Sequence, residues 1–265
     1  MRRRPALSTL LLILFTLPAI SVHAQDVPAD TVAQRLLQGH GADAWASAPY
    51  LRFNFAVERD GTAGTPIRHF WDRASGQYRV EWTARDTTYV GLINVQAVAN
   101  ETPDGEVYAD GNAIGGPHGT DLRKQAYRRF INDTYWLLAP LKVMDPGVNR
   151  SYVADSSDAT HHVLHLTFGD VGLTPGDQYW LYVNRETGRL DRWAFHLESM
   201  PDDATPAAFQ WTEYVTLDAP HGTVHLAKRH ASEGSSTAIL TESVALPSTP
   251  PDGVFTDPMP LHTDE

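Results

Sequence analysis

The chain has 265 residues, a formal net charge of −11, no cysteine and 10% aromatic residues. The lack of cysteine excludes disulfides, cysteine nucleophiles, thiolate metal sites and an acylated amino-terminal cysteine, while the negative charge argues against nucleic acids and anionic lipid surfaces as partners. A chain of this length can bury a core without disulfides, and a β-sandwich or barrel of this size is commonly one domain.

The first 24 residues have the pattern of a secretory signal peptide. Three arginines at positions 2–4 precede an apolar run over 10–20, and a small-residue exit predicts cleavage after Ala24. The run is shorter than the roughly 20 apolar residues of a spanning helix, and no later segment is apolar enough to span a bilayer. Cleavage leaves 18 Lys and Arg against 32 Asp and Glu, a charge of −14. We therefore expect a periplasmic or secreted protein without a membrane segment.

Residues 25–246 are expected to form one domain that begins with a short helix. Asp30 can cap the segment TVAQRLLQ, and Gly39 and Gly41 end it. At Tyr50 the period of the apolar residues changes from 3.6 to 2, which predicts a change from helix to strand.

Strands with one apolar and one polar face are predicted from this point onward. The apolar residues of the first strand occupy every second position: Leu51, Phe53, Phe55 and Val57. The same alternation predicts further strands over 67–71, 78–83, 88–99 and near Val107. The tripeptides at 74–76 and 103–105 contain glycine and predict turns between them.

The segment 120–138 is the one long helical pattern of the mature chain. Its apolar stripe is wide and covers two adjoining faces, which carry Leu122, Ala126, Phe130 and Leu137 together with Tyr127, Ile131, Tyr135 and Leu138. Lys124 and Arg128 mark the solvent side, residues 115–119 are expected to be a flexible lead, and Pro140 ends the helix. Such a helix either packs as core on a sheet or lines a cavity, and the pattern leaves both open.

Seven further strands are predicted after the helix, and short turns separate them. They cover 151–155, 161–168, 178–184, 189–198, 207–217, 222–231 and 237–246. Short connections and the lack of βαβ alternation predict antiparallel neighbours. Residues 247–265 contain five prolines and little periodicity, which indicates an extended Pro-rich tail.

Signals for catalysis, metals and cofactors are weak. His161 and His165 would share one face of a strand, but a compact zinc site needs a third ligand. Residues 115–119 could form an oxyanion loop, yet no G-x-S-x-G elbow supplies a nucleophile. Asp133 and Asp145 lie too far apart in sequence to form an evident acid and base pair. Without a phosphate loop or dinucleotide fingerprint, we expect no cofactor and no metal, and we lean away from an enzyme.

Aromatic residues are the best candidates for contacts with a ligand. The residues that could line a hydrophobic cavity are Phe53, Phe55, Trp71, Trp82, Phe130, Trp136, Trp180, Trp193 and Trp211. On the strand at 178–184, Tyr179 faces one side of the sheet and Trp180 the other, so both sides are apolar there. Most of these rings are expected in an ordinary core, and sugars also stack on such rings.

Three segments resemble an uncharacterised family of exported bacterial proteins. They are HFWDRASGQYRVEW (69–82), FINDTYWLLAPLKVMDPG (130–147) and QYWLYVNRETGRLDRWAFHLE (178–198). That family in turn looks like the LolA/LolB-type lipoprotein carriers of the outer-membrane lipoprotein-sorting superfamily, over most of the mature chain. The resemblance implies a mainly β fold with helices, in which one strongly curved antiparallel sheet forms an open or half β-barrel around the helix at 120–138. It also implies a hydrophobic concavity that holds acyl chains.

These observations favour an exported, non-catalytic protein that binds a lipid, a lipoprotein acyl chain or another acyl-bearing molecule between sheet and helix. The alternative is a secreted hydrolase of glycans or esters whose site is assembled from distant strands. A third possibility is an interaction module with a solid core. A water-free hollow would favour the first hypothesis, and a polar cluster at the mouth of a pocket would favour the second.

Overall fold

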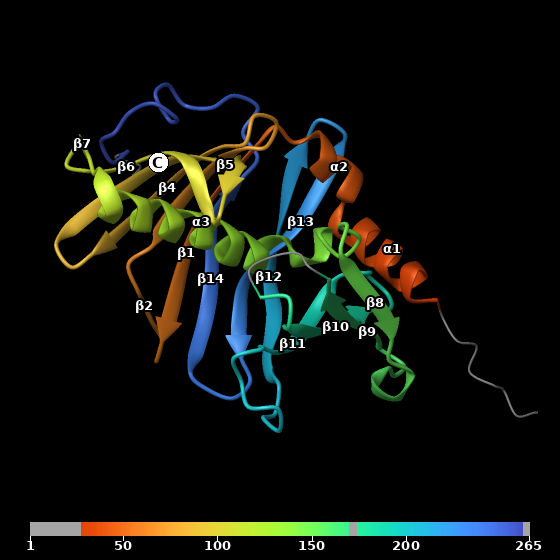
Figure 1. The fold of residues 1–265 in the computed structure, drawn as a ribbon. Helices are drawn as coiled ribbons and strands as arrows, with labels where there is room; N and C mark the ends of the chain where they lie inside the picture. The colour runs from red at the N-terminus through yellow and green to blue at the C-terminus, as the bar shows by residue number, and fades with distance from the viewer. Residues whose placement is uncertain (1–27, 170–173, 262–265) are drawn as a thin grey trace, which may run out of the picture.

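The computed structural model describes residues 28–169 and 174–261, in which one antiparallel sheet of fourteen strands curves around a long central helix (Figure 1). The helices are α1 (Ala29–His40), α2 (Ala42–Ser47) and α3 (Gly116–Leu138). The strands are β1 (Tyr50–Arg59), β2 (Thr62–Ala63), β3 (Ile67–Asp72), β4 (Gln77–Ala84), β5 (Thr87–Ala99), β6 (Thr102–Ala109), β7 (Asn112–Ala113), β8 (Val148–Tyr152), β9 (His161–Phe168), β10 (Gln178–Asn184), β11 (Leu190–His196), β12 (Ala207–Ala219), β13 (Gly222–Ser232) and β14 (Thr237–Ala245). The predicted fold class is confirmed, whereas the predicted signal peptide lies outside the described residues.

The sheet consists of two meanders that meet in its middle. Its strand order is β7-β6-β5-β4-β3-β1-β14-β13-β12-β11-β10-β9-β8, and β2 pairs with β1. The first meander contains the early strands and the second the late ones, so the single seam between them is the pairing of β1 with β14. Within the described chain, β7 and β8 are the free edges, and the barrel is therefore open.

Helix α3 crosses the concave side of the sheet from β6 to β13 (Figure 1). It begins at Gly116, before the predicted start at 120. The predicted flexible lead at 115–119 is therefore wrong from Gly116 on, because Pro117 in the first turn is compatible with a helix start, where its missing N–H is not needed. At the other end Pro140 lies in a short 3₁₀ turn, which confirms the predicted stop. None of the helices in the described part of the chain is both long and apolar enough to cross a membrane.

Helix α1 covers the sheet at the end that α3 leaves open, beside β8, β9 and β13. A Cβ atom on Gly39 would lie 2.5 Å from the backbone of Gly188 in the turn between β10 and β11. The helix can therefore approach this turn closely because residue 39 has no side chain. The predicted helix is confirmed, but Asp30 lies in its first turn and Pro28 is the N-cap residue.

The predicted turn at 103–105 is wrong. These residues lie inside β6, and the chain reverses at Asn100 and Glu101, whose φ angles are +50° and +60°. Both are polar residues in left-handed backbone, which suits a tight hairpin turn. Gly105, which suggested the turn, instead permits β6 to approach the Leu92 carbonyl, since a Cβ there would lie 2.2 Å from that oxygen.

The Pro-rich tail packs against the convex face of the sheet. Val254 is only 2% exposed, and the ring of Phe255 meets that of Phe70 edge-on at a centroid distance of 5.7 Å. The guanidinium of Arg79 on β4 donates hydrogen bonds to the carbonyls of three tail residues, Val254 at 3.2 Å, Asp257 at 2.7 Å and Met259 at 2.5 Å. The first meander is thus covered on both faces, by α3 inside and by the tail outside.

Candidate ligand-binding site

The predicted aromatic candidates lie on the concave face of the sheet or on α3, with one exception. Phe53 and Phe55 pack with Leu137, Trp82 packs with Leu122, and Trp193 and Trp211 lie in the core beneath Trp136. The exception is Trp180, which stacks on His165 at 4.8 Å on the other face of β10. We therefore correct the prediction that Trp180 shares a cavity with the other rings. Strand β10 carries large rings on both faces, and sequence alone could not decide between them.

Around the first half of α3 the rings fill the space between helix and sheet. Phe130 meets Trp71 at 5.0 Å and Tyr78 at 4.9 Å, in edge-on contacts, and lies 6.2 Å from Tyr127. Nearby, Trp82 stacks on Tyr89 at 5.3 Å. Such contacts leave no room for a guest, so this part of the interior is core.

A buried polar group lies within this core, between β3, β4 and α3. His69 Nδ1 is 2.5 Å from the hydroxyl of Tyr78, and His69 Nε2 is 3.2 Å from Asp133 Oδ2. Burial lowers the pKa of His69, an effect that the neighbouring Asp133 carboxylate opposes. Burial also raises the pKa of Tyr78 well above its usual value, and the Asp133 charge adds to this rise. All three residues are at most 2% exposed, and the group links α3 to the sheet.

Two pockets of the described chain adjoin the Pro-rich tail, whose Phe255 and Leu261 help to line them. The larger, about 200 Å³, is bounded by β4, β5, β6 and Phe255. The smaller, about 40 Å³, lies beside Arg52, Arg79 and Leu261. Neither lies between α3 and the sheet, where the cavity was predicted. Any ligand on the concave side must therefore bind where the aromatic rings are incompletely covered.

Such rings gather around the second half of α3, and we call this group the aromatic basin. It consists of six half-buried residues from one helix and four strands: Tyr135, Trp136, Phe168, Tyr179, Phe195 and Phe209. Trp136 meets Phe209 at 4.9 Å and Phe195 at 6.2 Å, and Phe195 stacks on Phe209 at 5.8 Å. Tyr179 connects the remaining rings, since it lies 5.4 Å from Tyr135 and 5.6 Å from Phe168.

Strand register explains why these rings converge. Tyr179 is paired with Phe195 across β10 and β11, and Trp193 with Phe209 across β11 and β12. Side chains of paired residues point to the same face of a sheet, and here that face is turned toward α3. Burial raises the pKa of both Tyr135 and Tyr179, so both hydroxyls stay neutral.

Beneath the basin lies a layer of fully buried rings with unpaired nitrogens. Trp193 and Trp211 are each 2% exposed and His230 is 0% exposed. Among the described residues, Trp193 Nε1, Trp211 Nε1 and His230 Nδ1 have no hydrogen-bond partner. Burial lowers the pKa of His230 from 6.5 to about 3, so the imidazole is neutral at pH 7. A buried polar atom without a partner costs about 1–3 kcal/mol, so these three neighbouring nitrogens make the layer a candidate for contact with a ligand.

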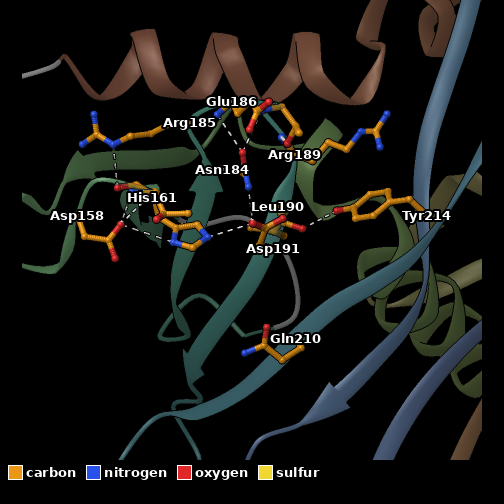
Figure 2. Close-up of polar contacts among 12 residues, drawn as sticks. Asp158, His161, Asn184, Arg185, Glu186, Arg189, Leu190, Asp191, Gln210 and Tyr214 are labelled. Carbon is orange, nitrogen blue, oxygen red and sulfur yellow. Dashed lines mark hydrogen bonds and ion pairs between the residues drawn. The ribbon is translucent and has the colours of Figure 1, made fainter.

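The hydrolase hypothesis calls for a polar cluster at the mouth of a pocket, and the strongest exposed cluster surrounds His161. Its Nε2 atom lies 3.0 Å from Asp191 Oδ2 and its Nδ1 atom 3.7 Å from Asp158 Oδ1, and the three side chains point toward one another (Figure 2). Asn184 donates to the same Asp191 oxygen at 2.7 Å. These residues join β9, β10 and β11, and none of them lines either pocket. Among the described residues, no group of three or more His, Cys, Asp or Glu side chains has a metal-binding arrangement.

The sequence pattern missed several residues of the basin and of the layer beneath it: Tyr135, Phe168, Tyr179, Phe195, Phe209 and His230. Five are aromatic residues in predicted elements: Tyr135 is predicted on the helix stripe and Tyr179 on one face of its strand, but none of the five is among the predicted cavity residues. Alternation along the predicted strand 189–198 places Trp193 and Phe195 on the same face, and alternation along 178–184 assigns Tyr179 to one face of its strand. The pairing of His230 with Trp211 depends on the register of two strands and has no local signal.

No protein-family model and no curated protein matches this sequence. Solved structures do show similarity. A DUF1329 family protein from Desulfovibrio piger is 12% identical with a TM-score of 0.48, covering 86% of this chain and 97% of its own. A LolA superfamily protein from Nitrosomonas europaea is 12% identical with a TM-score of 0.45, covering 87% of this chain and 98% of its own.

A third similar structure comes from Vibrio parahaemolyticus and is described as an outer membrane lipoprotein-sorting protein domain. It is 10% identical with a TM-score of 0.41, and the match covers 84% of this chain and 97% of that domain.

Proposed function

We propose that this chain is an exported binding protein that holds a lipid or another acyl-bearing molecule on the aromatic basin, without a covalent step. The observation that carries this proposal is the basin itself. Six half-buried rings from five elements converge on one face, around the second half of α3. Aromatic surface held partly in water, around a few polar groups, is typical of small-molecule sites.

The expected affinity follows from the burial of hydrocarbon. Each buried methylene group contributes about 0.8 kcal/mol, so a chain that buries about eight of them gains roughly 6 kcal/mol. This corresponds to a Kd of tens of micromolar, before any contribution from a head group. The ligand would lie across the basin, because the space around the first half of α3 is packed. There it would displace the ring of Trp136 or Phe209.

Export rests on the leader at residues 1–24. We propose that it is removed after Ala24 and that the mature protein is periplasmic or secreted. Cell fractionation followed by amino-terminal sequencing tests this, and Gln25 is the expected first residue. Retention of the leader in the cytoplasm would contradict it.

Native mass spectrometry of gently purified protein, followed by organic extraction, tests the binding function. We expect a bound hydrophobic molecule, or uptake of a 16-carbon fatty acid or lysophospholipid by protein that is purified empty. Phe195→Ala should weaken uptake at least fivefold, because it removes a ring of the basin on which the acyl chain would pack. Trp180→Ala is the matched control, because it removes a half-buried tryptophan from the opposite face, and uptake should not change. A protein that is empty and takes up none of these probes refutes the proposal.

A further inference from the structure

The buried layer beneath the basin offers one acceptor and two donors. Thr241 Oγ1 donates its only hydrogen to the Ala227 carbonyl at 2.8 Å. Its contact of 3.4 Å with His230 Nε2 therefore requires the proton on Nε2. The neutral imidazole has a single N–H, so Nδ1 is left as an acceptor, while the indole nitrogens of Trp193 and Trp211 can only donate.

These three groups belong to one ring cluster. The ring centroids of Trp211 and His230 are 4.3 Å apart, and those of Trp193 and Trp211 are 5.2 Å apart. Trp136 covers them, since its ring lies 4.7 Å from Trp193 and 5.6 Å from His230. Among the described residues, Trp71 and Trp82 also have unpaired indole nitrogens, but they lie around the first half of α3, away from the basin. Around that half the unpaired atoms of the described residues also include those of the ionisable His69 and Asp133, whereas beneath Trp136 all three are nitrogens of neutral rings.

We propose that the ligand of the basin presents an amide group to this layer, so that it is an N-acyl compound. An amide oxygen has two lone pairs and can accept from two indole N–H groups, and an amide N–H can donate to His230 Nδ1. An ester would satisfy the donors and leave the acceptor unpaired. An ether lacks the carbonyl and would satisfy the layer least. This inference rests on the proposed function of the basin and names its ligand class.

Access to the layer requires Trp136 to move. Its ring is half-buried, lies on the second half of α3 and contacts the rings of Trp193, Phe195, Phe209 and His230. A side-chain rotation that lifts this ring would expose the nitrogens without unfolding the helix. The acyl chain would then take its place against Phe195 and Phe209.

Three lysophosphatidylcholine analogues with the same 16-carbon chain and head group, joined by an amide, an ester or an ether, test the inference on the unmodified protein. We expect the amide to bind about tenfold more tightly than the ester, and the ester about fivefold more tightly than the ether. Tenfold corresponds to about 1.4 kcal/mol. Equal binding of the three, within twofold, overturns the inference but leaves the proposed function intact. If none binds, the proposed function itself fails.

Two variants locate the effect. Trp211→Phe keeps an aromatic ring and removes one donor, so affinity for the amide and the ester should fall about fivefold while the ether is unaffected. His230→Leu removes the acceptor and should abolish the preference for amide over ester. Trp180→Phe removes an indole N–H from the opposite face and should change none of the three affinities. Unchanged preferences in both His230→Leu and Trp211→Phe would place amide recognition elsewhere and overturn the assignment.

Discussion

The two halves of α3 lie on the same curved sheet, but the buried polar atoms around them have different surroundings. Around the first half, the unpaired atoms include the ionisable His69 Nε2 and Asp133 Oδ2, which face each other at 3.2 Å, and the sheet is covered on both faces. Around the second half, the nitrogens of Trp193, Trp211 and His230 have no partner among the described residues, and the rings above them are half-buried. The first arrangement holds a fold together, and the second is suited to a guest that completes it. We call the surroundings of the first half of α3 the closed half and those of the second half the open half. The closed half stabilises the fold, and the open half carries the proposed binding site.

The largest effect is expected from Arg79→Met in the closed half. Arg79 Nε donates to Glu81 Oε1 at 2.6 Å, and their side chains are 2% and 3% exposed. Loss of one partner leaves the other charge buried, which costs roughly 3–5 kcal/mol. Urea denaturation measures this loss.

The double variant with Arg79→Met and Glu81→Leu is the matched control, because it removes both charges and should recover part of the loss. The tail packs on Arg79, so limited proteolysis should cut near residues 251–261 faster in both variants. A single variant as stable as the parent would show that the tail and the ion pair are not required by the closed half.

A pair of tryptophan truncations compares the two halves directly. Trp82 is 1% exposed, and Trp82→Ala should cost about 3–5 kcal/mol, as truncation of a buried aromatic residue does. Trp136→Ala should cost about half as much, because its ring is already partly in water. Thermal unfolding of both variants measures the difference. Equal losses would mean that the open half is packed as tightly as the closed one.

Acid should weaken the open half through His230. Its pKa is about 3 in the folded protein against 6.5 when exposed, so the unfolded chain binds the proton first and stability falls as pH falls below 6.5. Between pH 7 and pH 5 the loss is about 2 kcal/mol for this residue. Urea unfolding at pH 7 and pH 5 measures this loss. Between the two pH values, the free energy of unfolding should fall by about 2 kcal/mol less in His230→Leu than in the parent protein. His40, whose pKa burial likewise lowers to about 3, contributes a similar loss in both proteins.

The smallest effect is expected on the solvent side of α3. Arg128 lies 2.9 Å from Glu101, with side chains 60% and 47% exposed. Exposed ion pairs of this kind contribute less than about 1 kcal/mol, so Arg128→Ala should shift stability by no more than about 0.5 kcal/mol. Chemical denaturation at low and high salt would detect anything larger. A large loss would mean that the closed half depends on its outer surface as well as its interior.

Local patterns predicted the elements that have a simple period. Phe53 and Phe55 lie on the concave face because alternate residues of a strand share a face, and Leu122 and Ala126 are buried by the helical repeat. The tail could not be predicted in this way, since Val254 and Phe255 follow no period and are buried through contacts with distant strands. The site depends on register: Trp211 faces His230 only because β12 and β13 pair in one alignment. The absence of a partner for a nitrogen depends on every neighbour and is visible only in the folded protein.

The seam between β1 and β14 has a consequence for how the chain reaches this fold. Residues near Phe55 pair with residues near Thr241, so the two meanders unite only after almost the whole polypeptide is present. Pairings between such remote segments close slowly, and until then the edges of both meanders are open to aggregation. The pairing of β1 with β14 should therefore form late in folding and in one cooperative step. In the cell, this step should depend most on chaperones.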